Sequence, residues 1–382
     1  MTVATERIPI ARPYLDGDAA DALRPCFETG WITMGPAVAE FEAEMQRTIG
    51  VPAIACSSCT AGMHLALLAW GIGPGDEVIV PAFSFIASAH AVACTGATPV
   101  FCEVDPDSGQ IDPQSAAAVL GDRTRAIMAV HMFGLPAPMR EINELARVHG
   151  LKVLEDAACA LGATYDGVPC GALGDAGSFS FHPRKVITMG EGGTLTSADT
   201  DLLDHAKAQR NHGARISGFD RHQSGQGAYP SFDLLGFNYR LTDLQARLGL
   251  VQLPQLDEIV GLRRAQAARY FAAFADLEGV RPLTAPKGCD PCWQSFSVHL
   301  LEGAPVSPEA LREHLNTRGI QAVQSGQVLP AAEYYRERTG WQPGAFPVAE
   351  HLVASGVSIP LFAGMTEAEQ QRVIDGVREC WS

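Results

Sequence analysis

Residues 77–104 read EVIVPAFSFIASAHAVACTGATPVFCEV and contain the pattern that decides the fold. Residues 77–81 form a short apolar run typical of a buried strand, residues 85–96 have a helical pattern, and residues 99–104 are apolar again. A strand, a helix and a second strand in this order are typical of a crossover between parallel strands. We therefore expect an α/β fold in which helices cover both faces of a mostly parallel sheet.

The same alternation continues toward the middle of the chain. Apolar segments without strict alternation fit strands that are buried on both faces. The next expected elements are a strand at 125–133, a helix at 138–149 and a strand at 152–156.

The character of the sequence changes after about residue 250. A long helix is expected over 256–274, followed by segments rich in Pro and Gly, a strand at 293–301 and a closing amphipathic helix at 366–379. We predict a large domain over residues 1–250, which includes the N-terminal segment, and a smaller C-terminal α+β domain over residues 251–382.

Composition excludes several classes of protein. The chain has 382 residues, is 47% hydrophobic and 19% charged, and carries a net charge of 28 − 43 = −15. These values indicate a folded globular protein and disfavour nucleic-acid binding, which needs a basic surface. No apolar run reaches the about 20 residues of a membrane helix, and the N-terminus lacks the pattern of a secretory signal. The ten cysteines are scattered, so we expect a cytoplasmic protein without a membrane segment.

Residues 57–67, SSCTAGMHLAL, follow the apolar run at 53–55 and open a helix with small hydroxyl residues. One interpretation is helix capping, since Ser and Thr are good N-caps. The other is a phosphate cradle, formed by free backbone N–H groups at the helix start with the hydroxyls of Ser58 and Thr60 alongside. The stretch by itself favours the capping interpretation.

Two ionisable residues follow predicted strands. Asp156 ends the strand at 152–156, where it caps the next helix or pairs with a protonated ring nitrogen of a ligand. Lys185 follows the stretch at 177–181 (GSFSF) and precedes a glycine cluster at 190–193 (GEGG). The chain has only four lysines, and Lys185 has the only context that suits a lysine forming a Schiff base.

Two other patterns carry little chemistry. The glycines at 71–75 (GIGPG) precede a strand, whereas a dinucleotide fingerprint precedes a helix. Residues 289–292 (CDPC) have the spacing of half a zinc site, but no second pair accompanies them, so we predict no metal.

Taken together, the motifs resemble the DegT/StrS family of pyridoxal-phosphate (PLP) aminotransferases, which have the type I fold of aspartate aminotransferase. The resemblance covers nearly the whole chain, and the order and spacing of its motifs make it specific. The matching motifs are 30–33 (GWIT) with Gly35, 73–81 (GPGDEVIVP), 96–100 (GATPV), 130–134 (VHMFG), 155–158 (EDAA), 174–175 (GD), 179–183 (FSFHP), Lys185, 190–193 (GEGG), 211–213 (NHG) and 237–243 (FNYRLTD).

The resemblance assigns roles to residues of this sequence. It implies that Lys185 and Asp156 are catalytic: Lys185 holds PLP as a Schiff base, and Asp156 keeps the pyridine nitrogen of PLP protonated. It further implies that Phe85 stacks on the ring and that Asn238 reaches the cofactor of the neighbouring subunit, so that a homodimer shares its active sites. The remaining implied contacts are Ser58, Cys59, Thr60 and Ser180 at the phosphate, Cys159 beside the ring, and Trp31, Thr33 and Arg240 at the substrate.

Two cysteines depart from the family pattern. The family usually has Gly at the position of Cys59. It usually has Gln or His at the position of Cys159, which donates a hydrogen bond to the phenolic oxygen of the cofactor. A thiol is a weaker donor.

The resemblance implies transfer of an amino group, with glutamate as donor, to a keto-sugar linked to a nucleotide diphosphate. A keto-cyclitol or another carbocyclic ketone is the alternative acceptor. A sugar dehydratase is disfavoured because the dehydratases of the family carry His in place of the lysine. A non-catalytic sensory or regulatory protein would not retain the cofactor residues, and a general α/β binding protein does not explain why Lys185 and Asp156 occur together.

Overall fold

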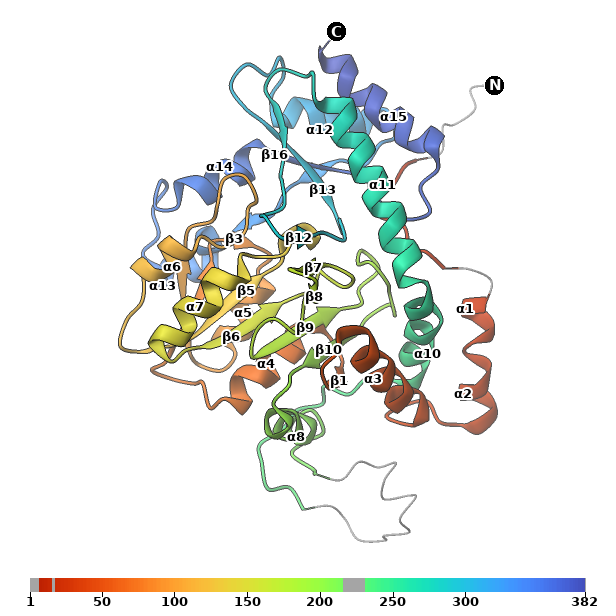
Figure 1. The fold of residues 1–382 in the computed structure, drawn as a ribbon, viewed down its shortest axis with the longest axis vertical. Coiled ribbons are helices and arrows are strands. Elements are labelled where there is room, and N and C mark those ends of the chain that lie inside the picture. The colour runs from red at the N-terminus through yellow and green to blue at the C-terminus, as the bar shows by residue number, and fades with distance from the viewer. Residues whose placement is uncertain (1–6, 16–17, 216–230, 382) are drawn as a thin grey trace.

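The computed structural model of the chain describes residues 7–15, 18–215 and 231–381 (Figure 1). Residues 1–6, from which no secretory signal is expected, lie outside the described residues. None of the helices described has the length and apolar character needed to cross a membrane.

A mostly parallel sheet forms the centre of the described chain, with strand order β1-β10-β9-β6-β5-β2-β4. The strands β4, β2, β5, β6 and β9 are parallel, whereas β10 is antiparallel to both β9 and β1. The parallel strands therefore end at one common edge. The bounds are β1 (Ala53–Cys56), β2 (Glu77–Pro81), β4 (Thr98–Cys102), β5 (Thr124–Val130), β6 (Lys152–Asp156), β9 (Ala176–Ser180) and β10 (Gly193–Thr196).

Helices cover both faces of this sheet, as Figure 1 shows. Val78 and Val80 of β2 pack with α4 (Cys59–Ala69), α5 (Ala87–Ala93) and α8 (Thr200–Gln209). Ile79 points the other way and packs with α7 (Met139–His149), and α3 (Pro36–Ile49) covers β1 on that side. The central strand β2 thus buries both its faces, and the α/β architecture expected from the sequence is confirmed.

A second, antiparallel sheet lies in the C-terminal part and has the order β11-β13-β16-β14. Its core includes residues of α11, α12 and α15, and also Ile8, which pairs with Ile320. The domain boundary at residue 250 stays a prediction. The bounds are α11 (Leu256–Phe274), β11 (Val280–Pro282), β13 (Phe296–Leu300), α12 (Pro308–Thr317), β14 (Val323–Gln324), β16 (Gly356–Ile359) and α15 (Glu367–Arg378).

Four expected elements differ from the structure by more than one residue at an end. The strand expected at 99–104 ends at Cys102, and the strand expected at 125–133 ends at Val130, because residues 132–134 form a 3₁₀ turn. The helix expected at 85–96 is shorter in the structure: α5 begins at Ala87, after β3 (Phe83–Ser84), which pairs with β15 (Gln327–Val328), and it ends at Ala93. The strand expected at 293–301 begins at Phe296, because the preceding residues lie against the central sheet instead.

The remaining elements are short or connecting. The helices are α1 (Asp18–Asp21), α2 (Arg24–Thr29), α6 (Pro113–Ala118), α10 (Asp243–Gln252), α13 (Glu333–Thr339), α14 (Pro347–Ser355), and the 3₁₀ turns η1 (Met132–Gly134), η2 (Leu253–Gln255), η3 (Leu329–Ala331) and η4 (Glu379–Trp381). The strands are β7 (Thr164–Tyr165), β8 (Val168–Pro169) and β12 (Cys289–Asp290).

Candidate active site

Lys185 lies in the connection between β9 and β10, close to the edge where the parallel strands end. Its backbone N–H donates to the carbonyl of His182 at 2.8 Å. Its Nζ atom lies 3.1 Å from Sγ of Cys159, which is in the segment that follows β6. The structure therefore brings together two residues that are far apart in the sequence but follow adjacent strands.

The surroundings of Lys185 act on its charge in opposite directions. Burial favours the neutral amine, which by itself lowers the pKa. The sulfur of Cys159, and then Asp156, favour the ammonium form. The second group of effects is larger, and the pKa of Lys185 is raised.

Asp156 is the last residue of β6, and only 6% of it is exposed. The hydroxyl of Ser88 donates to its Oδ2 atom at 2.7 Å, and the backbone N–H of Ala158 donates to Oδ1 at 3.2 Å. These donors are uncharged, and a carboxylate has about four acceptor sites. Asp156 can therefore accept a further, charge-assisted bond from a protonated ring nitrogen.

The start of α4 lies beside Asp156. The side chain of Ser58 caps the helix by accepting from the backbone N–H of Ala61 at 3.1 Å, so the capping interpretation of this stretch is correct. The Cys59 thiol lies 3.7 Å from Oδ1 of Asp156 and 3.3 Å from the carbonyl of Ser178. Burial, and then Asp156, raise the pKa of Cys59, so it remains a neutral thiol.

The start of β10 lies against the phosphate cradle expected at 58–60. Gly193, the first residue of β10, packs so closely on the backbone of Ser58 and Cys59 that a Cβ atom there would overlap both. Ser180 pairs with Gly193 across the β9–β10 ladder and so lies at the same edge. Thr60 is in the first turn of α4, where backbone N–H groups are free to bind an anion.

Among the other predicted site residues, one is exposed and four bond to parts of the chain away from Lys185 and Asp156. Phe85 is 63% exposed, just after β3, which leaves its ring free to contact a ligand. Asn238 forms a backbone bridge with Asn211, and Arg240 donates to the side chain of that same Asn211 at 3.0 Å. Thr33 bridges to Thr242, and Trp31 donates from its backbone to the hydroxyl of Thr29.

Two serines that contact this site were not predicted from the sequence. Ser88 donates to Asp156, and Ser178 donates to the carbonyl of Cys59 at 2.9 Å. Neither lies in a motif with a known chemical pattern. A helix residue placed two positions after Ile86 gives no signal that it will meet the end of β6.

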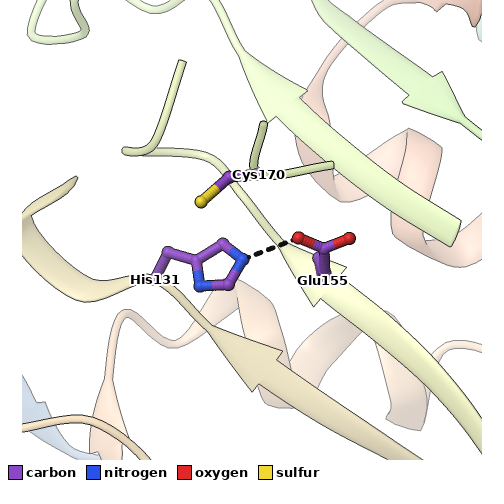
Figure 2. Close-up of side chains that lie close together, drawn as sticks. All are labelled: His131, Glu155 and Cys170. Carbon is purple, nitrogen blue, oxygen red and sulfur yellow. Dashed lines mark hydrogen bonds and ion pairs between the residues drawn. The ribbon is translucent and has the colours of Figure 1, made fainter. Parts of the chain in front are cut away.

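His131, Glu155 and Cys170 form a separate buried cluster (Figure 2). Nδ1 of His131 accepts from the backbone of Ala137 at 2.9 Å, so the ring proton is on Nε2, which donates to Glu155 at 2.9 Å. The two oxygens of Glu155 also accept from the backbone N–H groups of Gly171, Leu173 and Gly174. Both ring nitrogens of His131 and both oxygens of Glu155 are therefore hydrogen-bonded, and these bonds fasten the loop at 171–174 to the ends of β5 and β6.

The structure thus brings an amine and a carboxylate together at the end of a parallel sheet, next to a helix N-terminus, and comparisons with known proteins define the class of protein. The sequence matches the DegT/DnrJ/EryC1/StrS aminotransferase family over residues 13–378. The chain therefore belongs to this family, and it is an aminotransferase. The family resemblance and the enzyme class expected from the sequence are confirmed.

Individual relatives match over nearly their whole length. The chain is 39% identical over 376 residues to the GDP-perosamine synthase of Caulobacter vibrioides, which covers 96% of each protein. DesV of S. venezuelae, solved in complex with a ketimine intermediate, has 33% identity and a TM-score of 0.89, with 98% of each chain covered. The PLP form of the sugar aminotransferase Spr1654 from Streptococcus pneumoniae has 25% identity and a TM-score of 0.89, again with 98% of each chain covered.

Proposed function

We propose that this chain is a PLP-dependent sugar aminotransferase that transfers an amino group from glutamate to a nucleotide-linked keto-sugar. The observation that carries the proposal is the position of Lys185 and Asp156 at the ends of two adjacent parallel strands, next to the start of α4. In this reading Lys185 provides the reactive amine, Asp156 provides the carboxylate, and the helix start provides the anion site.

The residues at this edge fit PLP. Asp156 has acceptor capacity for the pyridine nitrogen, and Gly193, which has no side chain, lets β10 pack directly against the backbone of Ser58 and Cys59 at the start of α4. Ser58, Cys59, Thr60 and Ser180 would hold the phosphate, with Phe85 against the ring and Cys159 beside it. When bound, PLP supplies a protonated ring that stabilises negative charge on the substrate carbon that loses its proton.

The residues of the chain then have distinct tasks. Nζ of Lys185 would hold the aldehyde of the cofactor and, as the free amine, would accept a proton from the substrate carbon and give it up again. Asp156 holds a proton on the ring nitrogen through its carboxylate. Ser88 orients that carboxylate by its hydrogen bond to Oδ2.

The substrate class rests on the relatives. The name of GDP-perosamine synthase refers to a sugar carried on a nucleotide, and this protein shares 39% of the residues aligned with our chain. Trp31, Thr33 and Arg240 are the candidates for contacts with such a substrate. A keto-cyclitol is the alternative that the assay below separates.

We also propose that two copies of the chain complete each other's sites. Asn238 is exposed in the single chain, which leaves it available to a neighbouring subunit.

All ten cysteines are unpaired in the structure, which supports a reducing, cytoplasmic location.

The identity of the reactive lysine can be tested directly. The protein would be incubated with PLP, reduced with borohydride, digested and mapped by mass spectrometry. We expect the adduct on Lys185, and loss of the adduct in Lys185→Ala but not in Lys207→Ala, where the replaced lysine pairs with Asp204 on a helix surface. An adduct on any other lysine would remove Lys185 from the mechanism.

The substrate class needs a second assay. The enzyme would be supplied with glutamate and a panel of GDP-, UDP- and dTDP-linked keto-sugars and of keto-cyclitols, and the amine products would be detected by mass. We expect amination of a nucleotide-linked sugar. Turnover of cyclitols alone would replace the proposed substrate class.

A further inference from the structure

A four-residue segment from the C-terminal part lies across the active-site edge of the central sheet. We call residues 292–295 the strap; it connects β12 to β13 and consists of Cys292, Trp293, Gln294 and Ser295. Both ends of the strap bind the turn that follows β5. The backbone N–H of Cys292 donates to the carbonyl of Gly134 at 3.1 Å, and that of Ser295 donates to the carbonyl of Phe133 at 3.3 Å.

The strap also contacts the segments that follow the next two strands. The thiol of Cys292 lies 3.1 Å from the carbonyl of Cys159, after β6. The side-chain amide of Gln294 donates to the carbonyl of Arg184, after β9, at 2.5 Å. Since β5, β6 and β9 are neighbours in the sheet, one segment binds three consecutive strand ends.

Two of these contacts, those with the carbonyls of Cys159 and Arg184, lie next to Lys185. The carbonyl of Arg184 belongs to the peptide group whose nitrogen is that of Lys185. The nitrogen side of this peptide group donates to His182 at 2.8 Å, and its oxygen side accepts from Gln294. The peptide plane from which the Lys185 side chain projects is therefore held on both sides.

A buried cation supports the strap from behind. Arg263 of α11 is only 2% exposed, and its Nη1 atom lies 3.1–3.3 Å from the carbonyls of Trp293, Gln294 and Leu361. Burial lowers the pKa of Arg263 to about 10, so it stays charged at neutral pH. A charged donor to backbone carbonyls makes stronger bonds than a neutral one, and α11 thereby ties the strap to the second sheet.

Gly134, in the turn after β5, allows the strap to approach the central sheet closely. Gly134 has φ of +81°, and a Cβ atom at this position would lie 2.5 Å from Sγ of Cys292 and 2.8 Å from the nitrogen of Gln294. A side chain on residue 134 would lift the strap away from Cys159 and Arg184. The close approach therefore depends on glycine at this position.

We infer that Gln294 is a positioning residue for Lys185, because its amide fixes the peptide plane that aims the lysine at Cys159 and Asp156. The inference rests on the proposed function, in which Lys185 is the reactive amine. Gln294 comes from the segment that leads into the second sheet, so the direction of the catalytic side chain depends on how that sheet sits against the central one.

The variant Gln294→Met tests this, since it keeps the length of the side chain and removes the donor without adding a charge. Gln370→Met is the matched control. Gln370 is also buried, since 4% of it is exposed against 6% of Gln294, and its side-chain amide also donates to a backbone carbonyl, that of Gln266 in α11. In the cofactor-free protein, the pH dependence of reductive methylation of Lys185 would be followed by peptide mass. We expect the midpoint to move to lower pH in Gln294→Met, because the amine leaves Cys159 and Asp156, and to stay in place in the control.

With PLP and substrates present, kcat of Gln294→Met should fall about tenfold while KM changes less than about twofold. If Gln294→Met matches Gln370→Met in both the methylation midpoint and kcat, the strap is packing only and the inference is wrong. Should Gln294→Met fail to fold, Gln294→Leu, which also lacks the donor and adds no charge, gives the same kcat comparison. Failure of the wild-type protein to take PLP onto Lys185 would refute the proposed function instead, and the methylation midpoints would still decide whether Gln294 positions the amine.

Discussion

Replacing Glu155 by Gln should destabilise the protein far more than a change of one atom suggests. Glu155 is fully buried, and four donors converge on its two oxygens at 2.7–2.9 Å: Nε2 of His131 and the backbone N–H groups of Gly171, Leu173 and Gly174. A glutamine has one acceptor oxygen, and its NH₂ group would face the remaining donors. At least one pair of bonds to a charged acceptor is therefore lost.

The magnitude follows from that count. Hydrogen bonds to charged groups contribute about 1.5–3 kcal/mol each, so losing two of them costs about 3–6 kcal/mol before relaxation. Local rearrangement of the loop at 171–174 reduces this, and we expect the free energy of unfolding to fall by about 4 kcal/mol. Since domains are stable by only about 5–15 kcal/mol, the effect is a large part of the total.

The assay is urea denaturation of Glu155→Gln against Glu144→Gln. Glu144 is an exposed carboxylate paired with Arg147 three residues on, and such exposed pairs contribute little to stability. Equal losses in the two variants would refute the reasoning. A fall in the melting temperature of the wild-type protein on adding a chelator would show that the cluster of Figure 2 holds a metal instead.

Three further outcomes follow from the structure. Gly193→Ala should weaken PLP binding at least tenfold, measured by titration of the cofactor-free protein, because the new Cβ overlaps Ser58; unchanged affinity would place the phosphate elsewhere. Burial lowers the pKa of His299 to about 3, so between pH 6.5 and 3 the unfolded chain binds a proton that the folded one does not. Stability should therefore fall as the pH drops, by about 2 kcal/mol at pH 5. This part of the slope should vanish in His299→Asn, as followed by urea denaturation at several pH values. Mixing inactive Lys185→Ala subunits with inactive Asn238→Ala subunits should restore some activity if sites are shared, and no recovery after demonstrated exchange would mean that each chain builds its own site.

Local pattern was enough to predict much of the fold. The strands at 77–81 and 152–156 and the helix at 256–274 have the predicted bounds, because their apolar patterns and flanking residues act over short distances. The helix expected at 85–96 was wrong at both ends, and its start follows β3, which pairs with β15, whose residues lie more than 200 positions later in the chain. No local signal reports such a partner.

Local pattern indicated some residues of the candidate site but not the contacts between them. Lys185 and Asp156 could be singled out because each follows a strand pattern, and parallel strands end at one edge. The contact between Nζ of Lys185 and Sγ of Cys159 could not, because it depends on the paths of two loops. The role of Ser88 and the course of the strap depend on contacts between distant elements for the same reason.

The antiparallel strand β10 has a consequence for how the lysine is presented. Lys185 lies in a closed hairpin, whose two ends are joined by the pairing of Ser180 with Gly193 and by the bond from the N–H of Phe181 to the carbonyl of Gly192 at 3.0 Å. A bond from Met189 to the carbonyl of Phe181 at 2.9 Å divides this hairpin again. The conformational entropy of the connection is thus given up when the sheet forms, and little of it remains to be lost when the amine reacts. The lysine is preorganised by the ladder that builds the fold, so loosening the β9–β10 pairing should slow the chemistry even where every side chain of the site is intact.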